Sequence, residues 1–421
     1  MLAPLLLLIA LLLSGTAVFL ALGVTATVQL VADGHALGGI AQALVDRLNS
    51  ATLTAVPFFV TAATFMQRGG MAAALVGAAQ AWVGSLRGGL ALVVVMAAAL
   101  FASVSGSSTA TALALGTILL PAMAARGYPV RFNCGVIGAS ATLGILLPPS
   151  LALIIFGLVA TVPIPKLFLA GLIPALLQAI LFAVWIRLSV RQMPMVAADP
   201  PTPLPERIRV TLRALPALAV PTIALGGIYS GVVTLSEASA LAAATAIVIC
   251  WSNGSARGLV TIEWIGDAIK SATTILIVVG FAVLLGHWII LSGVPERLVG
   301  ILREADVSAL QFLLMMNIVM FILGMFLDVI STILITLPMV LPLLGPLGID
   351  PVHYAIVVIV NMELAALTPP VGLNIFVMVS VSRQSMVEVV RGLLPFIVLL
   401  LILLAIVTLV PELSLWLPGH L

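Results

Sequence analysis

The amino-acid sequence predicts an all-α polytopic membrane protein. Of its 421 residues, 62% are apolar and only 8% are charged, whereas roughly 25% of the residues of an average soluble domain are charged. Seventeen basic and 15 acidic residues are too few to coat a folded chain of this length, so a lipid bilayer must cover the rest of its surface. This composition excludes a water-soluble protein. The chain also lacks a basic stripe interleaved with aromatic residues, which argues against nucleic acid as a partner.

Apolar segments long enough to cross a bilayer, about 17 to 25 residues each, recur along the chain. The first begins with MLAPLLLLIALLL, which lacks the basic start and the cleavage site of a secretory signal, so we expect it to be retained. Its length fits either one tilted helix or two short helices, at about 1.5 Å per residue. We expect membrane spans at residues 3–31, 51–66, 133–158, 167–187, 213–232, 237–252, 271–291, 353–380 and 392–411.

Two further apolar segments, 90–122 and 309–343, predict re-entrant hairpins. Small and polar residues interrupt each segment near its middle, with SVSGSSTAT at 103–111 and GMFLDVIST at 324–332. Lipid cannot satisfy the polar groups of a non-helical backbone, so such a turn is tolerated only inside protein or beside a polar cavity. We therefore expect both hairpin tips to lie inside the protein near mid-membrane.

The chain contains two copies of one segment, which are offset by 221 residues without a gap. Proline and glycine are rare enough for their recurrence at one spacing to be informative. Between the copies, the hydrophilic segment 187–213 is rich in proline and arginine and predicts a cytoplasmic linker between a first repeat, 1–186, and a second repeat, 214–421. The matched landmarks are Pro121 and Pro342, Gly127 and Gly348, Pro148-Pro149 and Pro369-Pro370, Gly171 and Gly392, and Pro174 and Pro395.

The distribution of lysine and arginine predicts that the two repeats are inverted in the membrane. With the 187–213 linker placed in the cytoplasm, counting crossings outward from it puts 13 of the 17 basic residues inside, as the positive-inside rule requires. In that count the first hairpin opens from the cytoplasm and the second from the opposite face. Inverted repeats are typical of carriers that work by alternating access.

Each copy carries a Pro-Pro pair inside an apolar segment, at 148–149 and 369–370. Proline removes a backbone donor and clashes with the preceding turn, so the spans 133–158 and 353–380 are expected to be broken helices. The half-helices that follow aim their N-terminal N–H groups inward, where they stabilise an anion such as a carboxylate. With the hairpin tips, each repeat then supplies two pieces of non-helical backbone near the midplane, which is typical of an ion and substrate site.

Oxygen-bearing side chains gather at the same places. Hydroxyls crowd the first tip at 103–111, Asp328 lies at the second tip, and Thr142 and Thr368 lie beside the broken helices. Oxygen donors of this kind suit sodium. An acid inside the membrane is functional by default, so we expect a role for Asp328, whereas Glu363 fits either a functional role or simple pairing with another polar group.

Several phrases of the sequence resemble the large membrane subunit of tripartite ATP-independent periplasmic (TRAP) transporters. They are SGSSTATALALGTILLPAMAARGYPVRF, TLGILLPPS, LPMVLPLLGPLGIDPVHY and LTPPVGLNIFV. The resemblance implies an elevator-type carrier in the bacterial inner membrane, in which sodium as the coupling ion drives uptake of small organic acids. It also implies two partners, a periplasmic substrate-binding protein and a small four-helix membrane subunit. Because no extra helices precede residue 1, we expect that subunit to be a separate polypeptide.

The resemblance also assigns roles to particular residues, with substrate between the two tips. One departure is Ala365, which stands where the family usually has glycine. The expected sodium ligands are Ser105, Gly106, Ser107, Thr142 and Gly144 at the first site, and Asp328, Thr332, Thr368 and Gly372 at the second. The residues expected to line the substrate are Ser108, Thr109, Pro149, Ser331, Pro370 and Asn374.

Two other functions deserve comparison with this one. A stand-alone sodium/dicarboxylate or arsenite-type carrier shares the inverted-hairpin design but takes its substrate directly from solution. An intramembrane serine protease is suggested by Ser105-Gly106, but it needs a histidine base within hydrogen-bond reach. His287 and His353 are expected near the membrane surface, so we do not expect an enzyme.

Overall fold

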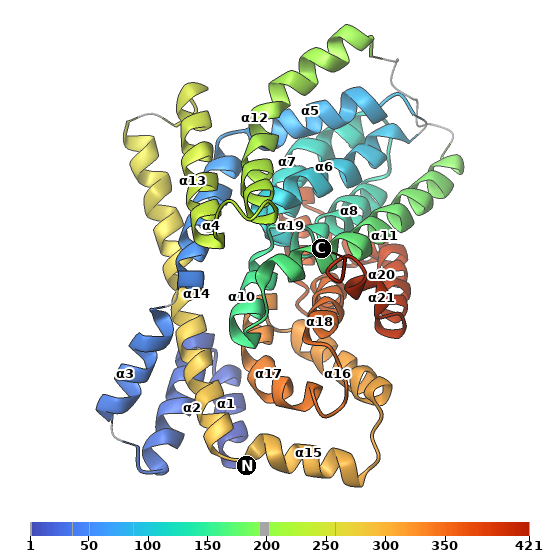
Figure 1. Ribbon diagram of the computed structural model, residues 1–421. Coiled ribbons are helices and arrows are strands. Elements are labelled where there is room, and N and C mark those ends of the chain that lie inside the picture. Colours follow the sequence, from blue (N-terminus) through green and yellow to red (C-terminus); the bar gives the residue numbers. More distant parts are fainter. Residues whose placement is uncertain are drawn as a thin grey trace.

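The structure, a computed structural model, describes residues 2–35, 37–49, 51–86, 88–193, 202–256 and 258–420. Within these ranges every regular element is an α-helix (Figure 1), which confirms the all-α prediction. Seven helical segments of the described chain are long and apolar enough to cross a membrane. The helices outside the two repeated segments are α1 (Leu2–Leu13), α2 (Val18–Ala32), α3 (Leu37–Leu48), α4 (Ala51–Arg68), α5 (Met71–Val83), α12 (Leu204–Tyr229), α13 (Leu235–Ser252), α14 (Leu259–Leu291), α15 (Val294–Glu304) and α21 (Glu412–Leu415).

Each repeated segment contains a pair of helices joined by a short turn, where the hairpins were expected. The pairs are α6 (Gly89–Ser105) with α7 (Ser108–Ala125), and α16 (Ala309–Gly324) with α17 (Val329–Leu344). Ser107 caps α7 by accepting a hydrogen bond from the backbone N–H of Ala110, and Asp328 caps α17 by accepting from Ile330 and Ser331. A capping oxygen satisfies an otherwise orphan N–H at a helix start. The two caps are themselves 221 residues apart, so the repeat extends to the turns.

Each hairpin is followed by a broken helix and a long helix. The first break separates α8 (Val130–Ser140) and α9 (Leu143–Leu146) from α10 (Leu151–Ala160), and the second separates α18 (Pro351–Ala366) from α19 (Leu373–Ser382). Both Pro-Pro bonds are cis. The long helices are α11 (Ile164–Arg191) and α20 (Met386–Leu409).

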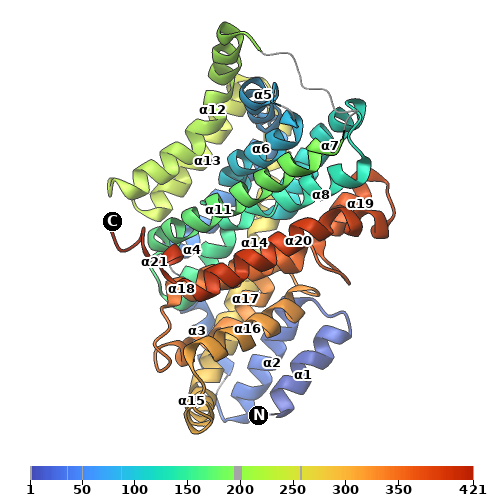
Figure 2. The same ribbon diagram turned by 90° about the vertical axis from the view of Figure 1, so that its right-hand side faces the viewer.

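The two repeated segments exchange packing partners. The second helix of each hairpin packs against the second half of the other broken helix, α7 on α19 and α17 on α10. Each long helix packs against the first half of the other segment's broken helix, α20 on α8 and α11 on α18. Figure 2 shows α11 and α20 side by side across this core. The contacts bury a continuous apolar core that includes Phe182 and Phe396, whose rings meet edge to face at 5.2 Å between centroids.

Helices α2, α4, α12, α13 and α14 pack together along one flank of this core, whereas α21 packs on α11 and α18. The 33-residue α14 packs against α2, α4 and α17, while α13 packs on α4 and α12 packs on α5 and α13. Figure 1 shows α14 running along that flank, from α4 and α13 at one end to α1 and α2 at the other. The first apolar stretch was expected to be either one tilted helix or two short helices. It forms two helices, α1 and α2.

Some boundaries differ from the sequence-based expectation. The helices flanking the linker extend into it, because α11 continues to Arg191 and α12 begins at Leu204 after a proline at its N-cap. Residues 194–201 of the expected linker lie outside the described residues, as do Arg87 and Arg257 of the charge count. No separate helix was expected at α3, α5 or α15.

Candidate functional site

The first hairpin tip is a compact cluster of oxygen atoms. Ser105 Oγ lies 2.7 Å from Thr111 Oγ1, and the Thr111 hydroxyl donates to the Ser107 carbonyl at 2.8 Å. Ser107 Oγ and Thr109 Oγ1 form a second pair at 3.1 Å. Gly106 turns the chain with φ +57°, a left-handed conformation that glycine adopts without strain.

This tip lies directly against the first broken helix. A Cβ on Gly144 would be 3.0 Å from Thr111 Oγ1 and 3.1 Å from the Ser107 carbonyl oxygen. A Cβ on Gly106 would similarly be 3.1 Å from the Pro149 carbonyl oxygen. The first tip, with Ser105, Gly106 and Ser107, therefore lies against Gly144 and Pro149 of the broken helix. Gly106 and Gly144 permit this close approach because they lack a side chain.

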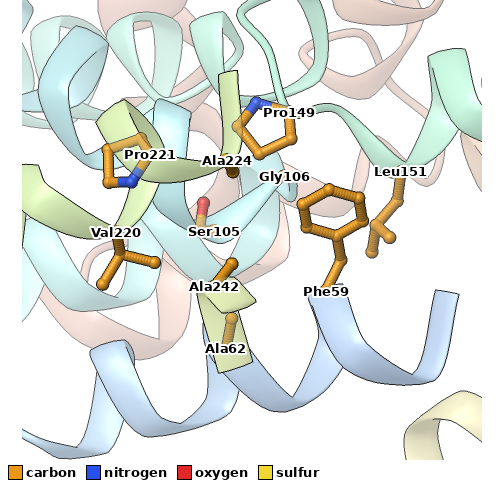
Figure 3. Close-up of a pocket in the computed structure, with 10 residues that line it drawn as sticks. All are labelled: Phe59, Ala62, Ser105, Gly106, Pro149, Leu151, Val220, Pro221, Ala224 and Ala242. Atoms are coloured by element: carbon orange, nitrogen blue, oxygen red, sulfur yellow. The ribbon is translucent and has the colours of Figure 1, made fainter. Parts of the chain in front are cut away.

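A pocket beside the first tip has an apolar lining (Figure 3). Ser105 supplies the only polar side chain among its ten lining residues in the described chain, and it is 2% exposed. The opposite wall comes from α4, α12 and α13. Those helices contribute Phe59, Ala62, Val220, Pro221, Ala224 and Ala242.

The second tip is built around Asp328, which is exposed. One carboxylate oxygen of Asp328 accepts the backbone N–H of Ile330 at 3.0 Å, and the other accepts the hydroxyl of Ser331. The Thr332 hydroxyl donates to the Asp328 carbonyl oxygen at 2.9 Å. A carboxylate at the start of α17 is stabilised by the N–H groups and by the positive end of the helix dipole.

The second break contacts its hairpin at a different point. A Cβ on Gly324, the last residue of α16, would be 2.7 Å from Cβ of Ala365, so the methyl group that departs from the family pattern touches the hairpin. The Thr368 hydroxyl donates to the Leu364 carbonyl oxygen at 2.8 Å, within its own helix. Among the described residues, no hydrogen bond joins Asp328 to Thr368 or Gly372. The expected second ion site is therefore less assembled than the first.

Asn374 connects the second broken helix to the first hairpin. Its side-chain oxygen accepts from the Ser108 hydroxyl at 3.2 Å, and its amide nitrogen donates to the Gly138 carbonyl oxygen at 3.2 Å. Ser108 and Asn374 are both buried. Of the other residues expected to line the substrate, Ser331 is buried, Thr109 is half-buried, and Pro370 is exposed.

Thr142 contacts residues that the sequence did not group with it. Its hydroxyl accepts from the Gln178 amide at 2.9 Å and lies 3.3 Å from Glu363 Oε2. Glu363 is 0% exposed. Thr142 and Glu363 are 221 residues apart, which is the repeat spacing itself. That spacing was the one signal that could have paired them, whereas Gln178 had none.

A serine-protease arrangement does not form around Ser105. In the described chain the Ser105 hydroxyl bonds to Thr111 and to the Ser107 carbonyl, with no histidine partner. His353 is buried in the protein, and its Nδ1 lies 2.9 Å from Ser414 Oγ.

A family model described as "Tripartite ATP-independent periplasmic transporter, DctM component" matches residues 5–413. The C4-dicarboxylate TRAP transporter large permease protein DctM of Pseudomonas aeruginosa is 38% identical over 88% of this chain and 87% of that protein. The isethionate TRAP transporter permease protein DctMQ of Oleidesulfovibrio alaskensis is 31% identical over 96% of this chain and 64% of that protein.

Among solved structures, the YdaH transporter of Alcanivorax borkumensis superposes with a TM-score of 0.66. The match covers 90% of this chain and 88% of that one at 14% sequence identity. At that identity the likeness extends to the fold alone.

Proposed function

This chain belongs to the DctM family of TRAP transporters, as a large permease component that passes through the membrane several times, and we propose that it couples sodium entry to the uptake of small organic acids. The proposal places it in the bacterial inner membrane. It would work with a small four-helix membrane subunit and a periplasmic binding protein that delivers the substrate. The relatives described above are named for a C4-dicarboxylate and for isethionate, which are both small organic anions.

The observation that carries the proposal is the exchange of partners between the two repeated segments. Each hairpin packs on the other segment's broken helix, α7 on α19 and α17 on α10. Such an exchange is what a pseudo-two-fold axis produces. The contact between Thr142 and Glu363 supports the same axis, because equivalent positions touch only where they lie next to it. Inverted repeats related in this way support re-entrant hairpins and alternating access.

Sodium would be held by oxygen atoms at the two tips. At the first tip, the candidates are the Ser105 and Thr111 hydroxyls and the Ser107 carbonyl, which are clustered within hydrogen-bond distance of one another. At the second tip, the candidate is the Asp328 carboxylate. Carbonyl oxygens of unwound backbone are typical sodium ligands in carriers with broken helices.

The substrate carboxylate would lie at the N-terminus of α19. The N-cap of that helix is Gly372, whose lack of a side chain leaves the first N–H groups without a side-chain cap. By contrast, Ser150 caps α10 by accepting from the N–H of Leu153. An uncapped helix start attracts an anion, and Asn374 lies in the first turn of α19.

We propose an elevator motion in which the hairpins, broken helices, α11 and α20 move against a scaffold that includes α4, α12 and α13. The apolar pocket wall beside the first tip supports this division. Sliding there would break no hydrogen bond or ion pair between the pocket's lining residues in the described chain.

The decisive experiment is uptake of labelled acids into liposomes that contain this subunit and its small partner, with candidate binding proteins added outside. We expect uptake only when a sodium gradient and a loaded binding protein are both present. Equal uptake without any binding protein would instead favour the stand-alone sodium/dicarboxylate or arsenite-type carrier. Uptake that ignores the sodium gradient would contradict sodium coupling.

A further inference from the structure

A pocket of about 430 Å³ lies where the ends of three helices meet. It is formed by the start of α8, the end of α11 and the start of α20, which pack against one another (Figure 2). Its volume is within the range of about 300 to 1,000 Å³ that is typical of sites for small molecules. None of its lining residues belongs to the sodium or substrate sites proposed above.

Two arginines line this pocket because α8 and α20 cross closely. A Cβ on Gly392 would clash with the Arg131 carbonyl oxygen, so glycine lets the two backbones touch at this point. Arg131 and Arg391, which precedes that glycine, both line the pocket. Ser189 and Gln192 of α11 add polar side chains to the same lining. Side chains that donate hydrogen bonds therefore come from all three helices.

The protein only partly balances the positive charge of the pocket. The lining contains no acidic residue. In the described chain Arg131 forms no ion pair, and Arg391 pairs with Glu388 of its own helix at 3.0 Å. Arg187 and Arg191 lie at the same end of α11 and are exposed. This charge favours an anion, and the lining offers no carboxylate to the ammonium group of a zwitterionic ligand.

An exposed apolar surface continues from the pocket along α11. Side chains four residues apart share one face of a helix, and the exposed ones on this face are Leu176, Ile180, Val184 and Leu188. Leu188 also lines the pocket, as does Trp185, and tryptophan is enriched where membrane meets water. A ligand that fits both regions has an anionic end and an apolar chain, which describes a phospholipid rather than free phosphate.

We propose that this pocket binds the phosphate group of an anionic phospholipid, whose acyl chain lies along the exposed face of α11. Arginine pairs with phosphate oxygens through two parallel hydrogen bonds. The count of lysine and arginine puts these helix ends on the cytoplasmic side, where basic pockets between membrane helices are typical sites for anionic headgroups. The proposal holds whether or not sodium drives uptake.

Titration of the purified protein in detergent with lipids, read by native mass spectrometry, tests the preference for an anionic headgroup. The probes are phosphatidylglycerol and phosphatidylcholine with identical acyl chains. We expect the first bound phosphatidylglycerol to bind about thirtyfold more tightly, because each of the two arginines contributes roughly fivefold. Equal affinities of the wild-type protein for the two lipids would overturn the proposal. Displacement of the lipid by inorganic phosphate would also overturn it, by assigning the pocket to the free ion.

Two double variants connect the preference to the pocket. Arg131→Gln with Arg391→Gln should remove most of it. The matched control, Arg209→Gln with Arg213→Gln, removes the same charge from α12, where Arg209 also pairs with a glutamate three residues earlier. The control should keep the preference within about twofold, because distant exposed charges are screened. An equal loss in both double variants would show that net charge sets the preference and would contradict a specific site.

Tryptophan fluorescence locates the bound lipid independently of the arginines. Phosphatidylglycerol with brominated acyl chains should quench the wild-type protein with a saturable component, and Trp185→Phe should remove that component. Trp416→Phe, which changes an exposed tryptophan outside the pocket, should keep it. Saturable quenching that survives in Trp185→Phe would place the lipid elsewhere. Release of the lipid when the small membrane subunit is added would assign the pocket to that subunit instead.

Discussion

The two hairpin tips occupy equivalent places in the repeat but have different surroundings. At the first tip, Pro148, Pro149 and Ser150 are buried, and the tip's hydroxyls bond to one another. At the second tip, Asp328 is exposed, and so are Pro369 and Pro370. One repeated pattern therefore produces a closed neutral tip and an open acidic one. The difference arises from what covers each tip, since α4, α12 and α13 pack over the first tip in the described chain.

The largest expected effect comes from separating the first tip from its broken helix. Gly144→Val should reduce transport by about tenfold to a hundredfold, because the new side chain would meet Thr111 and Ser107 at 3.0 and 3.1 Å and overpacking is costly. Gly226→Val is the matched control, because nothing lies within 4 Å of a Cβ there. Initial rates of uptake measure the effect. Equal rates in the two variants would show that the close approach is unimportant.

The open acidic tip predicts the next largest effect. Asp328→Asn should raise the half-saturating sodium concentration by about tenfold, because the charge is lost while asparagine still caps the helix. Asp350→Asn makes the same change at the cap of α18, where the carboxylate accepts from Val352 N–H at 2.7 Å. Sodium titrations of uptake compare them. Unchanged sodium activation in Asp328→Asn would remove this carboxylate from the ion site.

The link between the first tip and the second broken helix predicts a smaller effect. Ser108→Ala and Asn374→Ala should each weaken substrate binding, with a coupling energy of about 1 kcal/mol in a double-mutant cycle, because they remove the same hydrogen bond. The measured quantity is the half-saturating substrate concentration for the wild type, both single variants and the double variant. Strictly additive effects would mean that the bond plays no part in binding.

The smallest expected effect on transport tests the capped helix of the first break. Ser150→Ala should lower the free energy of unfolding by about 1 kcal/mol, because Leu153 N–H loses its capping oxygen. The half-saturating substrate concentration should change by less than about twofold, because we propose that the substrate carboxylate lies at α19 instead. Thermal unfolding and uptake are measured on the same preparation. A marked loss of substrate affinity would place the anion at α10.

Local features of the fold were predictable from the sequence, whereas long-range ones were not. Pro148-Pro149 and Pro369-Pro370 break their helices for steric reasons that act within a turn, so the sequence located both breaks. The position of Asp328 at the turn of its hairpin was predictable in the same way, because small and polar residues interrupt the apolar segment there. Gln178 was missed because an amide in an apolar helix has no local signature, and its partner Thr142 is 36 residues away. The amphipathic α15 was missed because it is too short for a span.

The closed and open tips also show why composition could not rank the two sites. The pattern SGSSTAT is richer in hydroxyls than GMFLDVIST, yet those hydroxyls bond mainly to their own hairpin. Whether these hydroxyls are exposed to an ion or a substrate depends on Phe59, Val220 and other residues from distant helices. Burial of this kind is set by tertiary packing and leaves no mark on the repeated segment itself.

The exchange of partners between the repeated segments has a consequence for biogenesis. Because α8 rests on α20 and α10 rests on α17, the first-made segment cannot complete its core while the ribosome is still synthesising the second. Thr142 enters the bilayer more than two hundred residues before Glu363 reaches it. A nascent chain stalled after α11 would therefore leave polar groups and apolar grooves open to lipid, as a substrate for membrane quality-control proteases.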